Sequence, residues 1–267
     1  MAYLSMTNLF EASNLSNLTV LLRQIHAREL ALPDFQRDFV WDPSMTQDLI
    51  VTIAYNHAAG SVWLIRDTLR VFAWRQFQGA PTLEGCHPSL LVLDGQQRLT
   101  SLYGVFYGVG EHHYYIDLRR LLDDTDFEDC VFHLRARSRQ ARAYETFDVQ
   151  AQDLVLSLSV LNGGMSDFSR WSRQVARTRA SEHERDALAD ALSEVAEGWV
   201  RAIDAYHFPV VTLAETTGVE AVCRMFEKLN GTGVKLGPFE LLTARFWPQA
   251  ISLRRLWSKA RSEPVYA

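Results

Sequence analysis

The chain has 267 residues, of which 48% are hydrophobic and 22% charged, and its formal net charge is −5. This composition is ordinary for a globular protein, and the negative total argues against a polycation that coats nucleic acid. No apolar run approaches the roughly 20 residues needed to span a bilayer, and the N-terminus does not resemble a signal peptide. The three cysteines lie far apart, without disulfide-framework or metal-site spacing. We therefore expect a cytoplasmic protein that does not contact a membrane.

The first half of the chain alternates between helical and strand-like patterns. Apolar residues at helical spacing predict a helix over residues 15–28, followed by an irregular segment rich in aromatics. Ser44 and Gln47 form a capping-box pattern that predicts a helix over 45–58, with Gly60 as its stop. Apolar runs predict strands over 61–66, 70–77, 89–93, 112–118 and 130–134, and a helix over 95–107.

The second half is predominantly helical. Residues 150–205 have a helical pattern, and Ser181 with Glu184 forms a second capping box before the apolar stripe Leu188, Leu192, Val195 and Trp199. A strand is predicted over 208–213, then helices over 218–229 and from about 238. We therefore expect an α+β fold with two parts, a mixed-sheet core over 1–149 and a largely helical region over 150–267. The amphipathic spacing persists near the last residues, so either the helix ends there or the natural protein continues.

The segment "LLVLDGQQRLTSLYG", residues 90–104, has two interpretations. Asp94 and Gln97 could form a helix capping box, with Gly95 relieving crowding at the turn. This leaves Arg98 unexplained, because a cation in the first turn of a helix opposes the helix dipole. Alternatively, the backbone amides of 95–97, the glutamine amides and the Arg98 guanidinium would hold a phosphate.

Two other segments supply further polar candidates. In "FQRDFVW", residues 35–41, Phe39 and Trp41 could stack on a base or could simply anchor the loop to the core. In "FEKLNGTGVKLGPFELL", residues 226–242, Asn230 begins an Asn-Gly pair that is typical of a helix C-cap. Asn230 could instead approach phosphates or a magnesium-bound water.

Arginines cluster in two places despite the negative net charge. The first cluster contains Arg135, Arg137, Arg139 and Arg142, and the second lies over residues 170–179. Either cluster could be a solvated face or a local patch that binds DNA phosphates. Arg135, Arg137 and Arg139 are spaced two apart and follow the predicted strand 130–134, so we expect these three to share one face of a strand rather than to spread around a helix.

"LPDFQRDFVW", "LLVLDGQQRLTSLYG" and "FEKLNGTGVKLGPFELLTA" together resemble, in order and spacing, the N-terminal (S-type) domain of GmrSD-type restriction systems. The Asp-Gly-Gln-Gln-Arg string is the hallmark of this domain, which is shared with other phage-defence proteins and is similar to the ParB/sulfiredoxin fold. The resemblance implies a domain that binds and hydrolyses a nucleoside triphosphate with Mg²⁺ and thereby controls DNA cleavage.

The resemblance also assigns candidate residues. Nucleotide-binding candidates are Gln36, Arg37, Gly95, Gln96, Gln97, Arg98, Thr100, Asn230 and Gly233. Asp94 and Gln97 are the catalytic candidates, since either would orient the attacking water. The implied partners are DNA, in a modified form, a nuclease domain or subunit, and a second copy of the chain in a homo-oligomer.

This sequence departs from full-length relatives in having no match to an HNH-type nuclease site, so we expect it not to cut DNA by itself. Two alternatives stay open at this point. One is a DNA-binding, modification-sensing module that does not hydrolyse nucleotides. The other is a metal-dependent nuclease, which the lack of clustered carboxylates disfavours.

Overall fold

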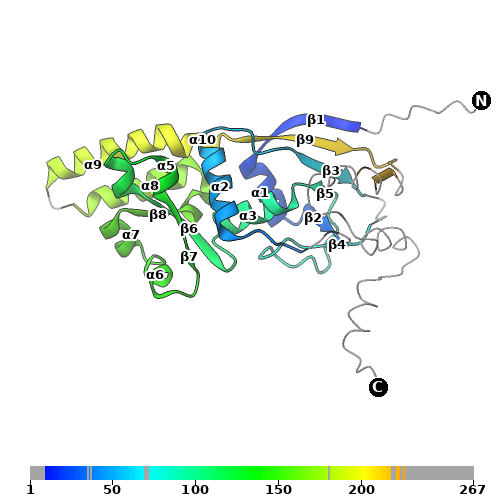
Figure 1. The fold of residues 1–267 in the computed structure, drawn as a ribbon, viewed down its shortest axis with the longest axis horizontal. Helices are drawn as coiled ribbons and strands as arrows, with labels where there is room; N and C mark the ends of the chain where they lie inside the picture. The colour runs from blue at the N-terminus through cyan, green and yellow to red at the C-terminus, as the bar shows by residue number, and fades with distance from the viewer. Residues whose placement is uncertain are drawn as a thin grey trace, which may run out of the picture.

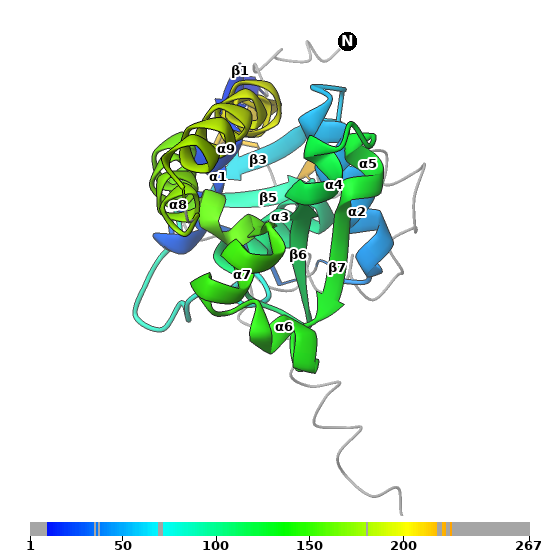
Figure 2. The same cartoon turned by 90° about the vertical axis from the view of Figure 1, so that its left-hand side faces the viewer.

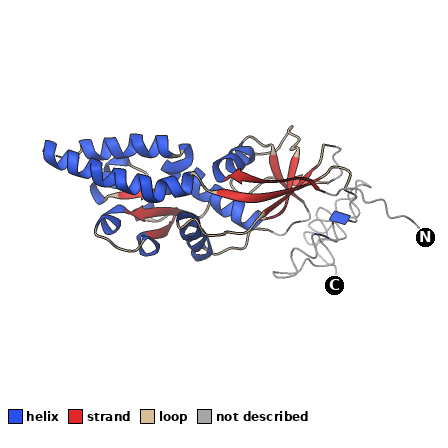
Figure 3. Cartoon of the chain, turned by 90° about the horizontal axis from the view of Figure 1, so that it is seen from above, coloured by secondary structure: helices blue, strands red, loops and turns tan. Residues whose placement is uncertain are grey.

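The structure is a computed structural model that describes residues 10–34, 36, 38–68, 72–179, 181–217, 221, 222 and 225. Its described part is an elongated α+β fold, as the sequence predicts. A six-stranded sheet lies at one end, and a three-stranded sheet with a pair of long helices lies at the other (Figures 1 and 3). The specific likeness to ParB and sulfiredoxin stays a prediction.

The larger sheet is mixed and has the strand order β1-β9-β3-β5-β2-β4. Its strands are β1 (Phe10–Asn17), β2 (Leu30–Pro33), β3 (Val62–Arg66), β4 (Trp74–Arg75), β5 (Leu90–Asp94) and β9 (His207–Leu213). β9 is parallel to β3 and β5 is parallel to β2, whereas the other neighbours are antiparallel.

Both faces of this sheet are covered. Leu64 and Val92 face the main core, where they pack with α1 (Leu18–His26), α2 (Pro43–Ala54) and α3 (Gln96–Tyr107). Ile65 and Leu91 point to the opposite face and pack in a second cluster. This alternation follows from the two-residue period of a strand, and burial on both faces explains why β3 and β5 are almost wholly apolar.

The smaller sheet has the order β7-β6-β8, with β6 (His112–Asp117), β7 (Val131–Arg135) and β8 (Val155–Ser157). Short helices surround it: α4 (Leu118–Leu122), α5 (Phe127–Cys130), α6 (Arg139–Ala143) and α7 (Phe147–Asp153). Figure 2 shows β6 and β7 running across the direction of β3 and β5. α3 leads directly into β6, so this connection joins the two sheets.

A 3₁₀ segment (Leu158–Gly163) leads into two long helices, α8 (Met165–Arg177) and α9 (Glu182–Val195), which pack against each other. The predicted capping box at Ser181 and Glu184 is confirmed at the start of α9. A π-helical turn (Ala196–Val200) and α10 (Arg201–Asp204) return the chain to β9. Strands from both sides of residue 149 share each sheet, and the division of the chain at that residue stays a prediction.

Several predicted boundaries are wrong at the start of the chain. Residues 15–17 belong to β1 rather than to a helix, and the Leu15 side chain is 68% exposed. A strand at the sheet edge buries only part of its side chains, and so its apolar residues can mimic a helical stripe. The segment after α1 contains β2, whose four residues are all buried. Periodicity does not reveal β2 because it is short and covered on both faces.

The ends of α2 also differ from the prediction. Asp42, rather than Ser44, caps this helix, because its carboxylate accepts a hydrogen bond from the backbone N–H of Met45. The helix ends at Ala54, well before Gly60, and Asn56 follows with a positive φ of 54°. Only Trp74 and Arg75 of the predicted strand 70–77 are in a strand, although 69–71 are not described.

The last predicted elements fall mostly outside the described residues. Ala221, Val222 and Met225 are the described members of the predicted helix 218–229, and the helix from 238 is not described. Within the described ranges, no helix combines the length and the apolar character that a membrane crossing requires.

Candidate functional site

The Asp-Gly-Gln-Gln-Arg segment forms a strand–turn–helix between β5 and α3. Gly95 has φ 96° and ψ 4°, a left-handed conformation that glycine adopts without steric cost. Gly95 is also the N-cap residue of α3, and no side chain in the described part of the chain makes a capping hydrogen bond there. The interpretation of Asp94 as the helix cap is therefore wrong, since the positive φ at Gly95 places the helix start one residue later.

Arg98 is held inside the chain. Its Nη2 atom lies 3.2 Å from Oδ2 of Asp94, and its Nη1 atom donates to the carbonyl of Ala59 at 2.8 Å. Gly60 makes this possible, because a Cβ atom at that position would lie 2.3 Å from Nη1 of Arg98. Asp94 thus supplies the negative charge that compensates Arg98 in the first turn of α3. Through its two bonds, Arg98 links the β5–α3 turn to the loop after α2.

The glutamines of the motif and of the first segment hold the loop before α2 against the sheet. Gln97 accepts a hydrogen bond from the backbone N–H of Val40 at 2.9 Å and donates to the carbonyl of Asp38 at 3.1 Å. Gln36 is only 2% exposed and donates to the carbonyls of Val92 and Leu93. The structure therefore brings the first two segments together, as expected if they form one site.

The remaining nucleotide-binding candidates fall in two groups. Gln96 and Thr100 are buried on α3, at 7% and 5% exposure. Arg37, Asn230 and Gly233 lie outside the described residues, so the position of the third segment stays open.

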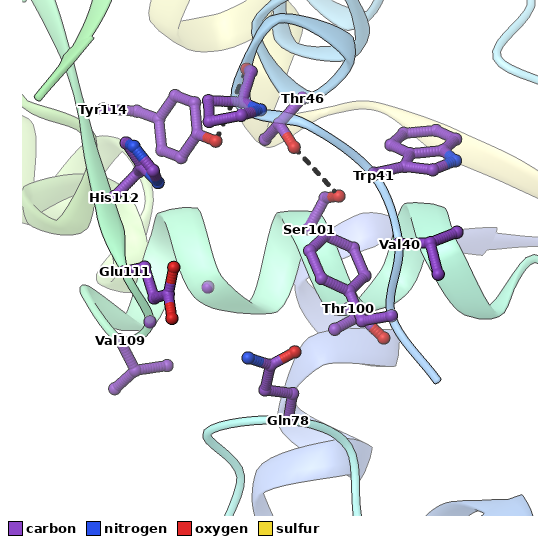
Figure 4. Close-up of a pocket in the computed structure, with 14 residues that line it drawn as sticks. Val40, Trp41, Thr46, Gln78, Thr100, Ser101, Val109, Glu111, His112 and Tyr114 are labelled. Carbon is purple, nitrogen blue, oxygen red and sulfur yellow. Dashed lines mark hydrogen bonds between the residues drawn. The ribbon is translucent and has the colours of Figure 1, made fainter. Parts of the chain in front are cut away.

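A cavity of about 340 Å³ lies beside this motif, between the loop before α2, the middle of α3 and the start of β6. We call it the α3–β6 cavity. Its lining consists of Phe39, Val40, Trp41, Pro43, Thr46, Gln78, Thr100, Ser101, Gly104, Val109, Gly110, Glu111, His112 and Tyr114. In Figure 4, Glu111 and His112 lie across the cavity from Trp41, and Gln78 lies on a third side. Aromatic and polar groups thus face the same space.

The polar groups of the cavity differ in whether they have hydrogen-bond partners within the protein. The hydroxyls of Thr46 and Ser101 bond to each other at 3.1 Å, and the Tyr114 hydroxyl donates to the Pro43 carbonyl at 3.5 Å. The buried Thr100 hydroxyl has no hydrogen-bond partner among the residues that the structure describes. Burial lowers the pKa of His112, which favours the neutral imidazole.

The first arginine cluster lies next to this cavity. Arg135 is the last residue of β7 and pairs across the sheet with His112, which lines the cavity. Arg137 follows in a turn, and Arg139 and Arg142 are on α6. The expectation of a single strand face is therefore wrong, because the strand ends at Arg135.

These four arginines are all exposed, and among the described residues none of them has an ion pair. We call them the arginine patch. In the second cluster, by contrast, Arg170 pairs with Asp167 and Arg173 donates to the Ser169 carbonyl. Among the described residues the two clusters therefore differ in that one arginine of the second, Arg170, has an ion pair, whereas none of the first has one.

Sequence reasoning did not find the cavity itself. Trp41 and Thr100 were candidates, but Gln78, Glu111, His112 and Tyr114 were not assigned to a common site. These four come from a loop and a strand that meet α3 only in the tertiary structure.

The first two segments, which the structure brings together, lie within a stretch of the chain that matches a known protein family. The chain matches the family model "GmrSD restriction endonuclease, N-terminal domain" over residues 18–247 and belongs to this family. It is also similar to the Methanocaldococcus jannaschii protein MJ0686, with 30% identity over 266 aligned positions. That alignment covers 91% of this chain and 43% of the relative, so the chain spans less than half of the relative's length.

Proposed function

We propose that this domain is a nucleotide-dependent regulator of DNA cleavage. It binds a nucleoside triphosphate with Mg²⁺, hydrolyses it, and so controls a nuclease domain or subunit that acts on modified DNA. The observation that supports this most directly is the β5–α3 turn of a GmrSD-family domain, where a helix begins at a glycine of positive φ without a side-chain cap. Such a helix start offers backbone N–H groups and a positive dipole end to a phosphate.

Arg98 can still contribute to this site. A guanidinium carries five N–H donors, and the bonds to Asp94 and Ala59 engage two of them. The ion pair with Asp94 also holds the Arg98 guanidinium at the turn, where the Arg98 side chain is 17% exposed. A phosphate on the amides of residues 95–97 would then receive charge-assisted hydrogen bonds from the same turn.

The residues present fit a magnesium ion only in part. Among the described residues, no group of three or more histidine, cysteine or acidic side chains is placed to hold a metal. Mg²⁺ in nucleotide sites is held mainly by substrate phosphates with one or two carboxylates, and Asp94 is the carboxylate at this turn. When bound, the ion would neutralise charge on the phosphates, while Asp94 or Gln97 would orient the attacking water.

The second candidate function is a modification-sensing DNA-binding module without hydrolysis. It is favoured by the Asp94–Arg98 ion pair, because Arg98 needs no bound anion when a carboxylate lies 3.2 Å away. The two functions differ in whether the β5–α3 turn binds a free triphosphate, which can be measured directly.

The test is calorimetric titration with a panel of nucleoside triphosphates, with and without Mg²⁺, combined with a phosphate-release assay. Arg98→Ala should weaken triphosphate binding at least tenfold, since a charge-assisted contact contributes about 1.5–3 kcal/mol. Asp94→Asn should reduce hydrolysis much more than binding. Arg173→Ala, on α8, is the matched control and should change neither.

Because Arg98 also has structural bonds, each variant's thermal unfolding must be recorded first, and binding compared only at temperatures where the variant is folded. Parent protein that binds none of the triphosphates would contradict the proposal and favour the second candidate. Normal hydrolysis in Asp94→Asn would limit Asp94 to its ion pair.

A further inference from the structure

The α3–β6 cavity combines features that a planar ring with polar edges requires. Trp41 provides aromatic surface on one side, and Gln78, Glu111 and His112 place an amide, a carboxylate and an imidazole around the rest. Phe39 is a second aromatic residue in the lining. Its volume of about 340 Å³ is at the small end of ligand sites, which span roughly 300–1,000 Å³. Exposed residues such as Val40 and Gln78 are part of its lining, so the cavity opens to solvent.

The cavity is separate from the Arg98 contacts. Residues on an α-helix are turned by about 100° each, so Thr100 and Gly104 lie on roughly the opposite side of α3 from Arg98. Arg98 points to Ala59 and Gly60, whereas Thr100 and Gly104 line the cavity. A ligand in the cavity therefore need not be the one held at the β5–α3 turn.

The arginine patch identifies the chemistry of the occupant. Arg135 pairs directly with the cavity residue His112, and Arg137, Arg139 and Arg142 extend the exposed positive charge from there. Arginines without ion pairs are suited to DNA phosphates, which fix a duplex in position without reading its sequence. A base-sized cavity beside a phosphate-binding surface is the arrangement used by proteins that extrude a base from DNA.

We propose that the α3–β6 cavity receives a nucleobase extruded from DNA whose phosphates lie on the arginine patch. This proposal rests on the proposed function, because it takes DNA as a ligand of the domain. It adds the place where the extruded base would bind. The base would stack on the aromatic side and present its edge to Gln78, Glu111 and His112.

The probe is a pair of short unmodified duplexes, one fully paired and one with a central mismatch. Extruding a mismatched base costs less, so the parent protein should bind the mismatched duplex about tenfold more tightly. Gln78→Trp would fill the mouth of the cavity from an exposed position and should remove this preference. Gln76→Trp is the matched control, because Gln76 is also exposed, lies two residues away and does not line the cavity.

Trp41→Ala provides a second test, and it should weaken binding of the mismatched duplex by roughly fivefold to a hundredfold through lost stacking. Trp41 also packs on the core, so Trp41→Ala could fail to fold. In that case the Gln78→Trp variant alone tests whether the cavity binds the base. Equal affinity of the parent for both duplexes would overturn the proposal. So would a preference that survives in Gln78→Trp.

A free nucleotide could supply the same base, and a separate arm distinguishes this source. If Gln78→Trp weakens binding of Mg²⁺–nucleoside triphosphate and leaves the mismatch preference unchanged, the cavity serves the nucleotide and the DNA assignment is overturned. Arg98→Ala should weaken triphosphate binding at least tenfold while the mismatch preference persists. Absence of triphosphate binding in the parent therefore contradicts the proposed function alone, whereas absence of DNA binding overturns the cavity assignment.

Discussion

At the scale of single residues, the position of Arg98 in the first turn of α3 needs a negatively charged partner, which could be a bound phosphate or another side chain. A cation in the first turn of a helix is unfavourable by roughly 0.3–1 kcal/mol. In the structure, Asp94 supplies the compensating charge and the Ala59 carbonyl accepts a second hydrogen bond. The local conflict is therefore resolved within the fold, and Arg98 contributes to stability whether or not a phosphate binds.

This pairing predicts a measurable coupling. Arg98→Ala should lower the free energy of unfolding by about 1–3 kcal/mol, because it leaves a partly buried carboxylate and a carbonyl without their partner. Asp94→Ala should cost less, since Arg98 keeps its bond to Ala59. In a double-mutant cycle followed by urea unfolding, we expect a coupling energy of about 0.5–3 kcal/mol. Additive costs would show that the ion pair contributes nothing measurable.

At the scale of elements, the loop after α2 and the start of α3 form one unit. Gly60 has φ 83° and lies so close to Arg98 that any side chain would displace the guanidinium. Sequence reasoning assigned Gly60 as a helix stop. Its actual role is to allow the close approach of a side chain from another helix, which only the tertiary contact reveals.

Gly60→Ala should therefore destabilise the domain in two ways, through strain at positive φ and through the clash with Arg98. Gly85→Ala is the matched control, because Gly85 has φ 70° but no atom within 4 Å of an added Cβ. We expect the control to cost about 1 kcal/mol and Gly60→Ala to cost clearly more in chemical denaturation. Combining Gly60→Ala with Arg98→Ala should recover part of the difference. Equal costs at the two glycines would exclude the contact as a source of stability.

At the scale of the whole molecule, the end of β7 and α6 carry an exposed positive surface on a chain of net charge −5. A negative total does not prevent local DNA binding, because charges more than about 8–10 Å away are screened at physiological ionic strength. The arginine patch and the α3–β6 cavity are neighbours through β6, whereas Arg98 and its partners lie on another side of α3.

We expect the affinity for DNA to fall steeply with salt, because each phosphate neutralised by an arginine releases counterions. Reversing Arg135, Arg137 and Arg139 to Glu should weaken binding and flatten the slope of log affinity against log salt by about 0.9 per lost contact. The charge-matched control reverses Arg170, Arg173 and Arg177 on α8. If both triple variants behave alike, the effect is one of net charge and the arginine patch is only a solvated surface.

The sequence by itself determined the elements with strong local signals. The strand before Asp94, the helix after Gly95 and the capping box at Ser181 follow from apolar runs, backbone freedom and short-range hydrogen bonds, all of which depend on neighbouring residues. The family was also evident from three segments, because their order and spacing are properties of the chain and not of its folding.

Tertiary structure alone decided the partners of those residues. β2 forms as a strand because β5 and β4 lie beside it, and Arg98 is satisfied because the chain returns near it at Ala59. The α3–β6 cavity exists because the loop containing Trp41 meets the strand containing His112. Pairings between segments distant in sequence leave no periodic signal in either segment, since each depends on what the other segment offers in space.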